Sequence, residues 1–174
     1  ESIFKHETKG KYIILNVTFK LSKKPTFHVE YGAINDTLAE MGITELSIKA
    51  ISNAVIHIRQ SKLPNPAEIG NAGSFFKNPE IPKTQFEALK AQFPTIPSYP
   101  VSETTTKVPA GWLIEQAGWK GQRFGNVGVH SKQALVLVNY GGGKGEEIRD
   151  LSQKIQASVK EKFSIQLSAE VNFI

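Results

Sequence analysis

The order in which hydrophobic spacings follow one another constrains the fold of this chain more than any single motif. Spacings typical of strands alternate with helical spacings, and the clearest helix is expected near residues 146–162. Residues 134–138 are almost wholly apolar, as expected of a central strand. From about residue 70 the expected order is strand, helix, helix, strand, strand, helix, strand. This order predicts an α+β fold with helices on one face of a mostly antiparallel sheet.

Local signals predict the other elements of this region. Proline and glycine delimit helices near 82–93 and 110–117, and a strand near 126–130 precedes the central one. The proline-rich residues 94–108 are expected to form a loop with at most a short strand. Alternating apolar residues from Ile165 onward predict a last strand.

The N-terminal third has a different pattern. Residues 12–21 alternate apolar and polar side chains and predict a long half-buried strand. Two helices are expected next, one near 33–41 and one capped by Thr44 and ending near residue 60. Two prolines within residues 63–66 mark the expected domain boundary. We therefore expect three parts: the end of another domain at 1–63, a separate domain at 64–168, and a terminal strand at 169–174.

The charge balance favours an anionic partner. The net charge is +5 and the isoelectric point about 9.3, but the lysines are scattered and form no basic run. Lysines that converge on a phosphorylated small molecule therefore fit better than a nucleic-acid groove. The chain has no cysteine, and it has no apolar run near the roughly 20 residues that cross a bilayer. We expect no membrane contact and no thiolate metal site.

Residues 70–79 form the most informative motif, because they place Ser74 between a glycine-containing turn and two aromatic residues. Gly70 and Gly73 permit backbone conformations that other residues avoid. Phe75 and Phe76 are expected to shield the Ser74 hydroxyl from water. The simpler interpretation is a tight turn that leads into a buried strand.

Three other features are candidates for chemistry. Glu170 lies in a segment that otherwise resembles core, which suggests a carboxyl in a pocket with a raised pKa; an outward-facing strand residue is the alternative. His130 ends a strand and is expected at the rim of a pocket, whereas His57 is expected on a helix without a ligand role. Residues 141–145 lack the phosphate-loop pattern and are expected to be a flexible connection.

Several motifs in this order resemble one known family, the UDP-N-acetylenolpyruvoylglucosamine reductases. The resemblance covers essentially the whole chain. It rests on the following segments: residues 2–7, 59–64, 70–79, 110–116, 128–130 and 170–174. It implies that residues 1–63 are the tail of a domain that binds FAD, and that the N-terminal half carrying most of the flavin contacts is absent from this chain.

The resemblance also implies an activity. Enzymes of this family reduce the enolpyruvyl ether of UDP-N-acetylglucosamine to UDP-N-acetylmuramate in peptidoglycan synthesis, with NADPH as reductant and FAD as carrier. We accordingly expect a cytoplasmic enzyme that is a monomer when full length. We expect this chain to need the missing N-terminal flavin-binding half as its partner, and to be inactive alone.

The family implies roles for individual residues. Ser74 matches the proton donor to the substrate carbon, and Glu170 matches the glutamate that stabilises the enol intermediate. The family also has an active-site arginine, whose position falls at or before residue 1 of this chain. Arg59 matches a different family position near the site and is not a substitute for that arginine. The remaining matches are substrate contacts: Tyr31, Lys62, Asn78, Lys120, Gln133 and, more weakly, Tyr99.

Two alternatives remain open from the sequence. A non-catalytic module that binds a nucleotide sugar would use the same lysines and tyrosine but would need neither Ser74 nor Glu170. A nucleic-acid-binding domain is supported by the charge alone, and its affinity would fall steeply with salt.

Overall fold

The computed structural model describes residues 2–5, 7–30 and 32–173, so Tyr31 lies outside the described residues. The chain forms two compact units, Glu1–Ala54 and Val55–Ile174. Helix α2 (Ile48–Lys62) begins in the first unit and ends in the second. The boundary expected at residue 63 stays a prediction. No helix among the described residues is long and apolar enough to span a lipid bilayer.

The first unit has a short 3-10 helix η1 (Ile3–Lys5), helix α1 (Ile34–Glu40) and the start of α2. Its small core consists of Leu38, Ala50 and Ala54. The Ser47 hydroxyl accepts a hydrogen bond of 3.1 Å from the backbone N–H of Ala50. Ser47 therefore caps α2, and the expectation that Thr44 does so was wrong. A serine directly before the first turn reaches an unpaired amide that Thr44, three residues earlier, does not.

The strand predicted at residues 12–21 is absent. The segment is described, but it has no strand assignment, and its apolar side chains are exposed, with Ile13 and Leu15 each 88 % exposed. The alternation was real, but a strand also needs a neighbour whose N–H and C=O groups pair with its own. No such neighbouring strand is present in the part of the chain that the structure describes.

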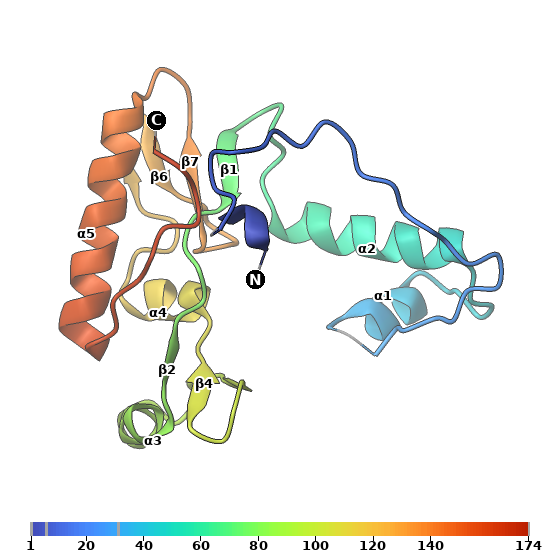
Figure 1. The fold of residues 1–174 in the computed structure, drawn as a ribbon, viewed down its shortest axis with the longest axis horizontal. Coiled ribbons are helices and arrows are strands. Elements are labelled where there is room, and N and C mark those ends of the chain that lie inside the picture. The colour runs from blue at the N-terminus through green and yellow to red at the C-terminus, as the bar shows by residue number, and fades with distance from the viewer. Residues whose placement is uncertain (1, 6, 31, 174) are drawn as a thin grey trace. The chain divides into compact units, whose positions relative to one another are not determined.

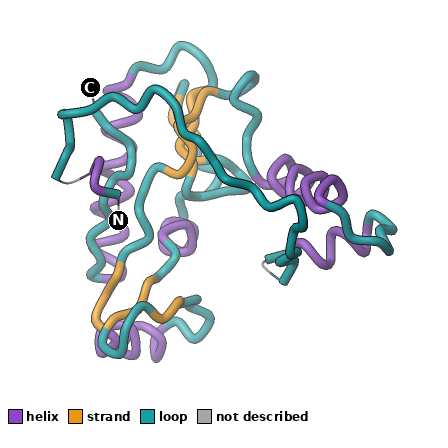
Figure 2. The backbone as a smooth tube through the Cα atoms, turned by 45° about the vertical axis from the view of Figure 1, so that its right-hand side comes forward, coloured by secondary structure: helices purple, strands orange, loops and turns teal. Residues whose placement is uncertain are grey.

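The second unit is an α+β structure with two small antiparallel sheets, which confirms the predicted fold class (Figure 1). The larger sheet has the strand order β1-β7-β6-β5, and the smaller one has the order β2-β4-β3. Figure 2 shows how short these strands are between long loops. The elements are β1 (Gly70–Ser74), β2 (Glu80–Pro82), α3 (Lys83–Gln92), β3 (Tyr99–Pro100), β4 (Thr105–Lys107), α4 (Ala110–Gln116), β5 (Arg123–Phe124), β6 (Val127–Val129), β7 (Val136–Asn139) and α5 (Gly145–Phe163).

Helix α5 organises the core of this unit. It packs against β6, β7 and α4, and Figure 1 shows it along one side of the larger sheet. Its buried stripe consists of Leu151, Ile155, Val159 and Phe163, which confirms the helix predicted at 146–162. Each such side chain contributes about 1.5–3 kcal/mol when it is fully buried.

Residues 94–108 contain two short strands, where at most one was expected. Thr105 and Thr106 in β4 pair with Pro82 and Ile81 of β2, and β3 pairs on the other side. Consecutive β-branched residues favour this extended conformation, and they outweigh the turn signal of the nearby prolines.

The terminal strand expected at 169–174 is also not formed in residues 169–173, the described part of this segment. This segment makes a single isolated bridge, between Phe76 and Ala169. The bridge has two backbone hydrogen bonds, from Lys77 N–H to Ser168 O at 2.9 Å and from Glu170 N–H to Phe75 O at 2.8 Å. The alternating side chains before it, Ile165 and Leu167, are buried in the core. The two hydrogen bonds and the burial of these side chains therefore fix the segment without a longer ladder.

Candidate active site

A β-bulge places Ser74 at the end of β1. Asn71 pairs with Val138 and Ser74 pairs with Val136, so β1 has one more residue than β7 between these two pairs. Gly73 lies in the bulge with a φ of 72°, a region that glycine enters without steric cost. The Asn71 side chain stabilises the bulge, because its Oδ1 accepts a hydrogen bond of 3.1 Å from Gly73 N–H. A bulge of this kind re-aims the side chain that follows it.

Ser74 is exposed in this chain, and the expectation that two phenylalanines shield it was wrong. Phe75 and Phe76 are 4 % and 1 % exposed and belong to the hydrophobic core. Their rings pack against each other edge to face, with centroids 5.1 Å apart. Burial of both rings is more favourable than covering a hydroxyl, because each removes a large apolar area from water. The two rings therefore anchor the end of β1 and leave its serine at the surface.

Glu170 lies beside this end of β1 across the isolated bridge. Its backbone N–H donates to the carbonyl of Phe75, the residue after Ser74. The structure thus brings the segments of the two predicted catalytic residues together, although 95 positions separate them in the sequence. The Glu170 side chain is exposed, so the expectation of a buried carboxyl was wrong and the outward-facing alternative describes its position in this chain.

Three of the predicted substrate residues lie around α4. The Asn78 Oδ1 accepts a hydrogen bond of 2.9 Å from the N–H of Ala110, the first residue of the helix. The Gln133 side chain lies over Gly111, where an added Cβ would come within 3.2 Å of its Oε1. At the other end, Lys120 Nζ forms an ion pair of 2.8 Å with Glu115.

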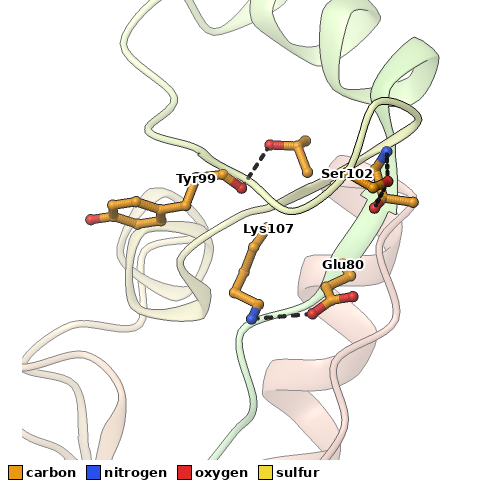
Figure 3. Close-up of polar contacts among 6 residues, drawn as sticks. Glu80, Tyr99, Ser102 and Lys107 are labelled. Atoms are coloured by element: carbon orange, nitrogen blue, oxygen red, sulfur yellow. Dashed lines mark hydrogen bonds and ion pairs between the residues drawn. The ribbon is translucent and has the colours of Figure 1, made fainter.

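The other predicted substrate residues lie on different elements. Lys62 is the exposed last residue of α2. Tyr99 is in β3, 60 % exposed, and its carbonyl accepts a hydrogen bond of 3.2 Å from the Thr106 hydroxyl. Figure 3 shows its ring pointing away from the Lys107–Glu80 ion pair, whose atoms are 3.1 Å apart. No contact given by the structure joins Lys62 or Tyr99 to the residues around α4 among the described residues.

A pocket of about 880 Å³ adjoins the bulge, and the sequence did not reveal it. Its lining combines the end of α2, the loop that follows, β1, β7 and His130, with these residues: Arg59, Gln60, Leu63, Pro64, Asn65, Pro66, Glu68, Ile69, Asn71, Gly73, His130 and Val136. His130 was expected at a pocket rim, and this is confirmed. Arg59, which matches a family position near the site, is also one of the lining residues.

The environment of His130 disfavours the charged form of its imidazole. Burial lowers its pKa below the usual value, and the positive charge of Lys132 lowers the pKa further. Its Nδ1 is buried without a hydrogen-bond partner among the described residues. No group of three or more histidine, cysteine or acidic side chains that could hold a metal occurs within the described ranges.

Comparison with known proteins shows the family of the chain. A family model described as "UDP-N-acetylenolpyruvoylglucosamine reductase, C-terminal domain" matches residues 65–174. The chain belongs to this family. The match confirms the resemblance seen in the sequence, and it begins at residue 65, shortly after α2 ends at Lys62.

Curated proteins named UDP-N-acetylenolpyruvoylglucosamine reductase are similar to the chain over its whole length. The protein from Amoebophilus asiaticus is 58 % identical over 174 residues, which are 100 % of this chain and 51 % of the relative. The protein from Flavobacterium johnsoniae is 55 % identical over 175 residues, 100 % of this chain and 52 % of the relative. The protein from Pseudomonas putida is 48 % identical over 172 residues, covering 99 % and 50 % respectively. The chain spans about half the length of these reductases.

Proposed function

We propose that this chain is the C-terminal, substrate-binding part of a reductase that converts UDP-N-acetylenolpyruvoylglucosamine to UDP-N-acetylmuramate in cytoplasmic peptidoglycan synthesis. The observation that carries the proposal is the bulge at Gly73, which presents Ser74 at the surface next to the segment of Glu170. The hydride in this reaction comes from NADPH by way of FAD. The residues of this chain bind the substrate and supply the proton.

Ser74 donates a proton to the substrate carbon next to the carboxylate. An alcohol is a weak acid in water, so the step depends on a strongly basic carbon and on a hydroxyl held at close range. The bulge supplies a fixed position for this hydroxyl. Glu170 stabilises the enol form of the substrate from the neighbouring segment. Exposure of both residues in this chain suits a site that the remainder of a longer protein covers.

The residues around α4 bind the nucleotide-sugar diphosphate. Lys120 provides a positive charge, while the Asn78 and Gln133 amides provide directed hydrogen bonds. Tyr31 and Lys62 add further contacts to the diphosphate, and Tyr99 is a weaker contributor. A monomeric full-length enzyme contains one such site.

The role of Ser74 is tested in the full-length enzyme with Ser74→Ala. We expect flavin reduction by NADPH to stay within about twofold of wild type, and substrate reduction to slow by about 10²–10⁴-fold, the usual contribution of a positioned acid. Rapid-mixing absorbance measurements separate the two half-reactions. Ser168→Ala, an exposed serine on the neighbouring segment, is the matched control and should affect neither. Loss of the NADPH half-reaction in Ser74→Ala would contradict the assignment.

The same experiment separates the reductase from a non-catalytic nucleotide-sugar binding module. A module of that kind would bind UDP-sugars equally well with Ser74→Ala and would show no turnover to lose. A binding titration with UDP-N-acetylglucosamine, run beside the kinetics, distinguishes the two functions.

We also propose that this chain alone binds no flavin stoichiometrically and does not turn over. The support is the exposed apolar segment 12–21, which has no partner strand in the part of the chain that the structure describes. Absorbance near 450 nm after purification and incubation with FAD measures the bound flavin. About one flavin per chain would contradict the proposal.

A further inference from the structure

The segment 164–170, which carries Glu170, is described throughout and lies outside every helix and strand. It leaves α5 at Ser164, whose φ of 54° turns the chain, and it returns past α5 toward the end of β1 (Figure 1). Buried side chains, Ile165 and Leu167, alternate with exposed ones, as on an extended backbone. Burial sets which side chains point inward, but the backbone carbonyls of the segment need partners of their own.

Two successive carbonyls of this segment are bound from opposite sides. Ser168 O accepts a hydrogen bond of 2.9 Å from Lys77 N–H, at the isolated bridge. Successive carbonyls of an extended backbone point in opposite directions, so Leu167 O points away from β1. Gln156 on α5 reaches this carbonyl, and its Nε2 donates to Leu167 O at 2.8 Å. Backbone therefore holds the segment on one side and a side-chain amide holds it on the other.

Gln156 is the amide that connects this carbonyl to the rest of the molecule. Gln166 Nε2 also lies 3.3 Å from Leu167 O, but Gln166 is an exposed residue of the segment itself. A contact within the segment cannot fix its position relative to other elements. Gln156 can fix it, because it is half-buried on a helix whose neighbouring side chains Ile155 and Val159 are packed in the core.

A second glutamine binds the segment at its start. Gln85 on α3 donates through Nε2 to Ser164 O at 3.1 Å. This hydrogen bond has the same chemistry as that of Gln156, but Ser164 lies six residues before Glu170, whereas Leu167 lies three residues before it. The buried side chain of Leu167 separates Ser164 from Glu170, so a change at Ser164 is absorbed before it reaches the carboxylate. The chain thus contains a matched control for Gln156.

We propose that Gln156 is a positioning residue for Glu170, because its amide fixes Leu167 and thereby the place of the carboxylate beside Ser74. The inference rests on the proposed function, in which Glu170 stabilises the enol form of the substrate. Glu170 N–H donates to Phe75 O at 2.8 Å, so the segment meets the end of β1 at this residue. An isolated bridge stands here in place of a ladder, so loss of the Gln156 bond lets the segment move against β1. A displacement of about 1 Å at a reacting group slows a reaction by up to about 10²-fold.

The test replaces Gln156 in the full-length enzyme and measures the two half-reactions by rapid mixing. Gln156→Leu keeps the size of the side chain but has no donor. We expect it to slow substrate reduction by about tenfold or more, while flavin reduction by NADPH stays within about twofold and the KM for the substrate is unchanged. Gln156→Lys keeps an N–H donor on a long side chain and should restore most of the lost rate.

Gln85→Leu is the matched control. It removes the same kind of hydrogen bond from the same segment, so we expect a similar loss of stability in urea. Substrate reduction in this variant should nevertheless stay within about twofold of wild type. Equal slowing in Gln85→Leu and Gln156→Leu would overturn the inference, because general loosening of the segment would then explain both.

Dependence on Glu170 is the second readout. Gln156→Leu should add no further slowing to Glu170→Ala, because the two changes then act on one group. A full additional slowing in that background would overturn the inference, as would a wild-type rate in Gln156→Leu alone.

A variant that fails to fold does not end the test. If Gln156→Leu does not fold, Gln156→Glu replaces it, since an ionised carboxylate has the same length and cannot donate. A wild-type rate of substrate reduction in Gln156→Glu, or a rate in Gln156→Lys as low as in Gln156→Glu, would overturn the inference. A wild-type rate in Glu170→Ala would instead contradict the proposed function, because the carboxylate would then have no role in the step.

Discussion

Gly73 adopts a φ of 72°, and nothing lies within 4 Å of the position where a Cβ would be added. Substitution at this residue therefore tests backbone conformation without steric overlap. For an L-residue the left-handed region costs about 1–2 kcal/mol. Asparagine enters this region more readily, because its short polar side chain bonds locally.

We expect Gly73→Ala to lower the free energy of unfolding by about 1–2 kcal/mol and Gly73→Asn to lower it by less. Urea denaturation followed by tryptophan fluorescence gives both values. Equal losses in the two variants would contradict a requirement set by the left-handed conformation.

For single residues, the sequence indicated which residue types matter better than it indicated where their side chains point. The need for a permissive glycine before Ser74 could be predicted, and the pair Asn71–Gly73 was a further signal of a local turn that went unused. The burial of both Phe75 and Phe76 could not be predicted, because two consecutive buried residues break the alternation of a regular strand. The ion-pair partner of Lys120 could not be predicted either, because Glu115 lies within α4 and Lys120 lies past the end of that helix.

Helix α4 is the element on which the proposed substrate contacts depend. It has seven residues, no side-chain cap from its own N-terminal neighbour, and a first amide that donates to Asn78. A side chain that satisfies such an amide stabilises a helix by about 0.5–2 kcal/mol. Asn78 therefore holds the start of α4 in addition to its proposed substrate contact, and a single substitution cannot separate the two.

A pair of substitutions separates them. Asn78→Ala removes both the acceptor for Ala110 and the amide proposed to contact the substrate, so we expect a loss of about 1 kcal/mol in stability together with a raised KM. Asn78→Asp keeps the acceptor but adds a negative charge, so stability should be retained while KM rises at least as much. Urea denaturation and steady-state kinetics of the full-length enzyme measure the two effects. A normal KM in Asn78→Asp would contradict the substrate role.

Helices were predictable as elements, and isolated strands were not. The stripe of α5 and the glycine- and proline-delimited α3 and α4 follow from local sequence, because a helix satisfies its backbone within itself. Strand assignment at 12–21 and 169–174 failed because a strand is defined by its neighbour. The two short strands near residue 100 were missed for the opposite reason, since proline signals concealed the pairing with β2.

The large hydrophobic cluster of the molecule lies entirely within residues 75–167. The first unit has a separate small cluster of its own. The chain also has two tryptophans, Trp112 and Trp119, and both pack against the large cluster. Tryptophan fluorescence therefore reports the unfolding of the second unit alone.

We expect a chain of residues 55–174 to fold by itself and to unfold in urea with a free energy within about 1 kcal/mol of that of residues 1–174. The reason is that its core loses no member of the large cluster. It should also be more soluble, because the exposed apolar residues 12–21 are removed. Loss of a cooperative transition would show that the first unit stabilises the second.

The bulge in β1 has a consequence for how this sequence tolerates change. Between the pairs Asn71–Val138 and Ser74–Val136, β1 has one residue more than β7, so deleting one residue among 71–73 would leave a regular ladder without a bulge. Ser74 would still pair with Val136, but its side chain would lose the direction that the bulge gives it. The length of this stretch therefore matters to the site as much as the identity of its residues.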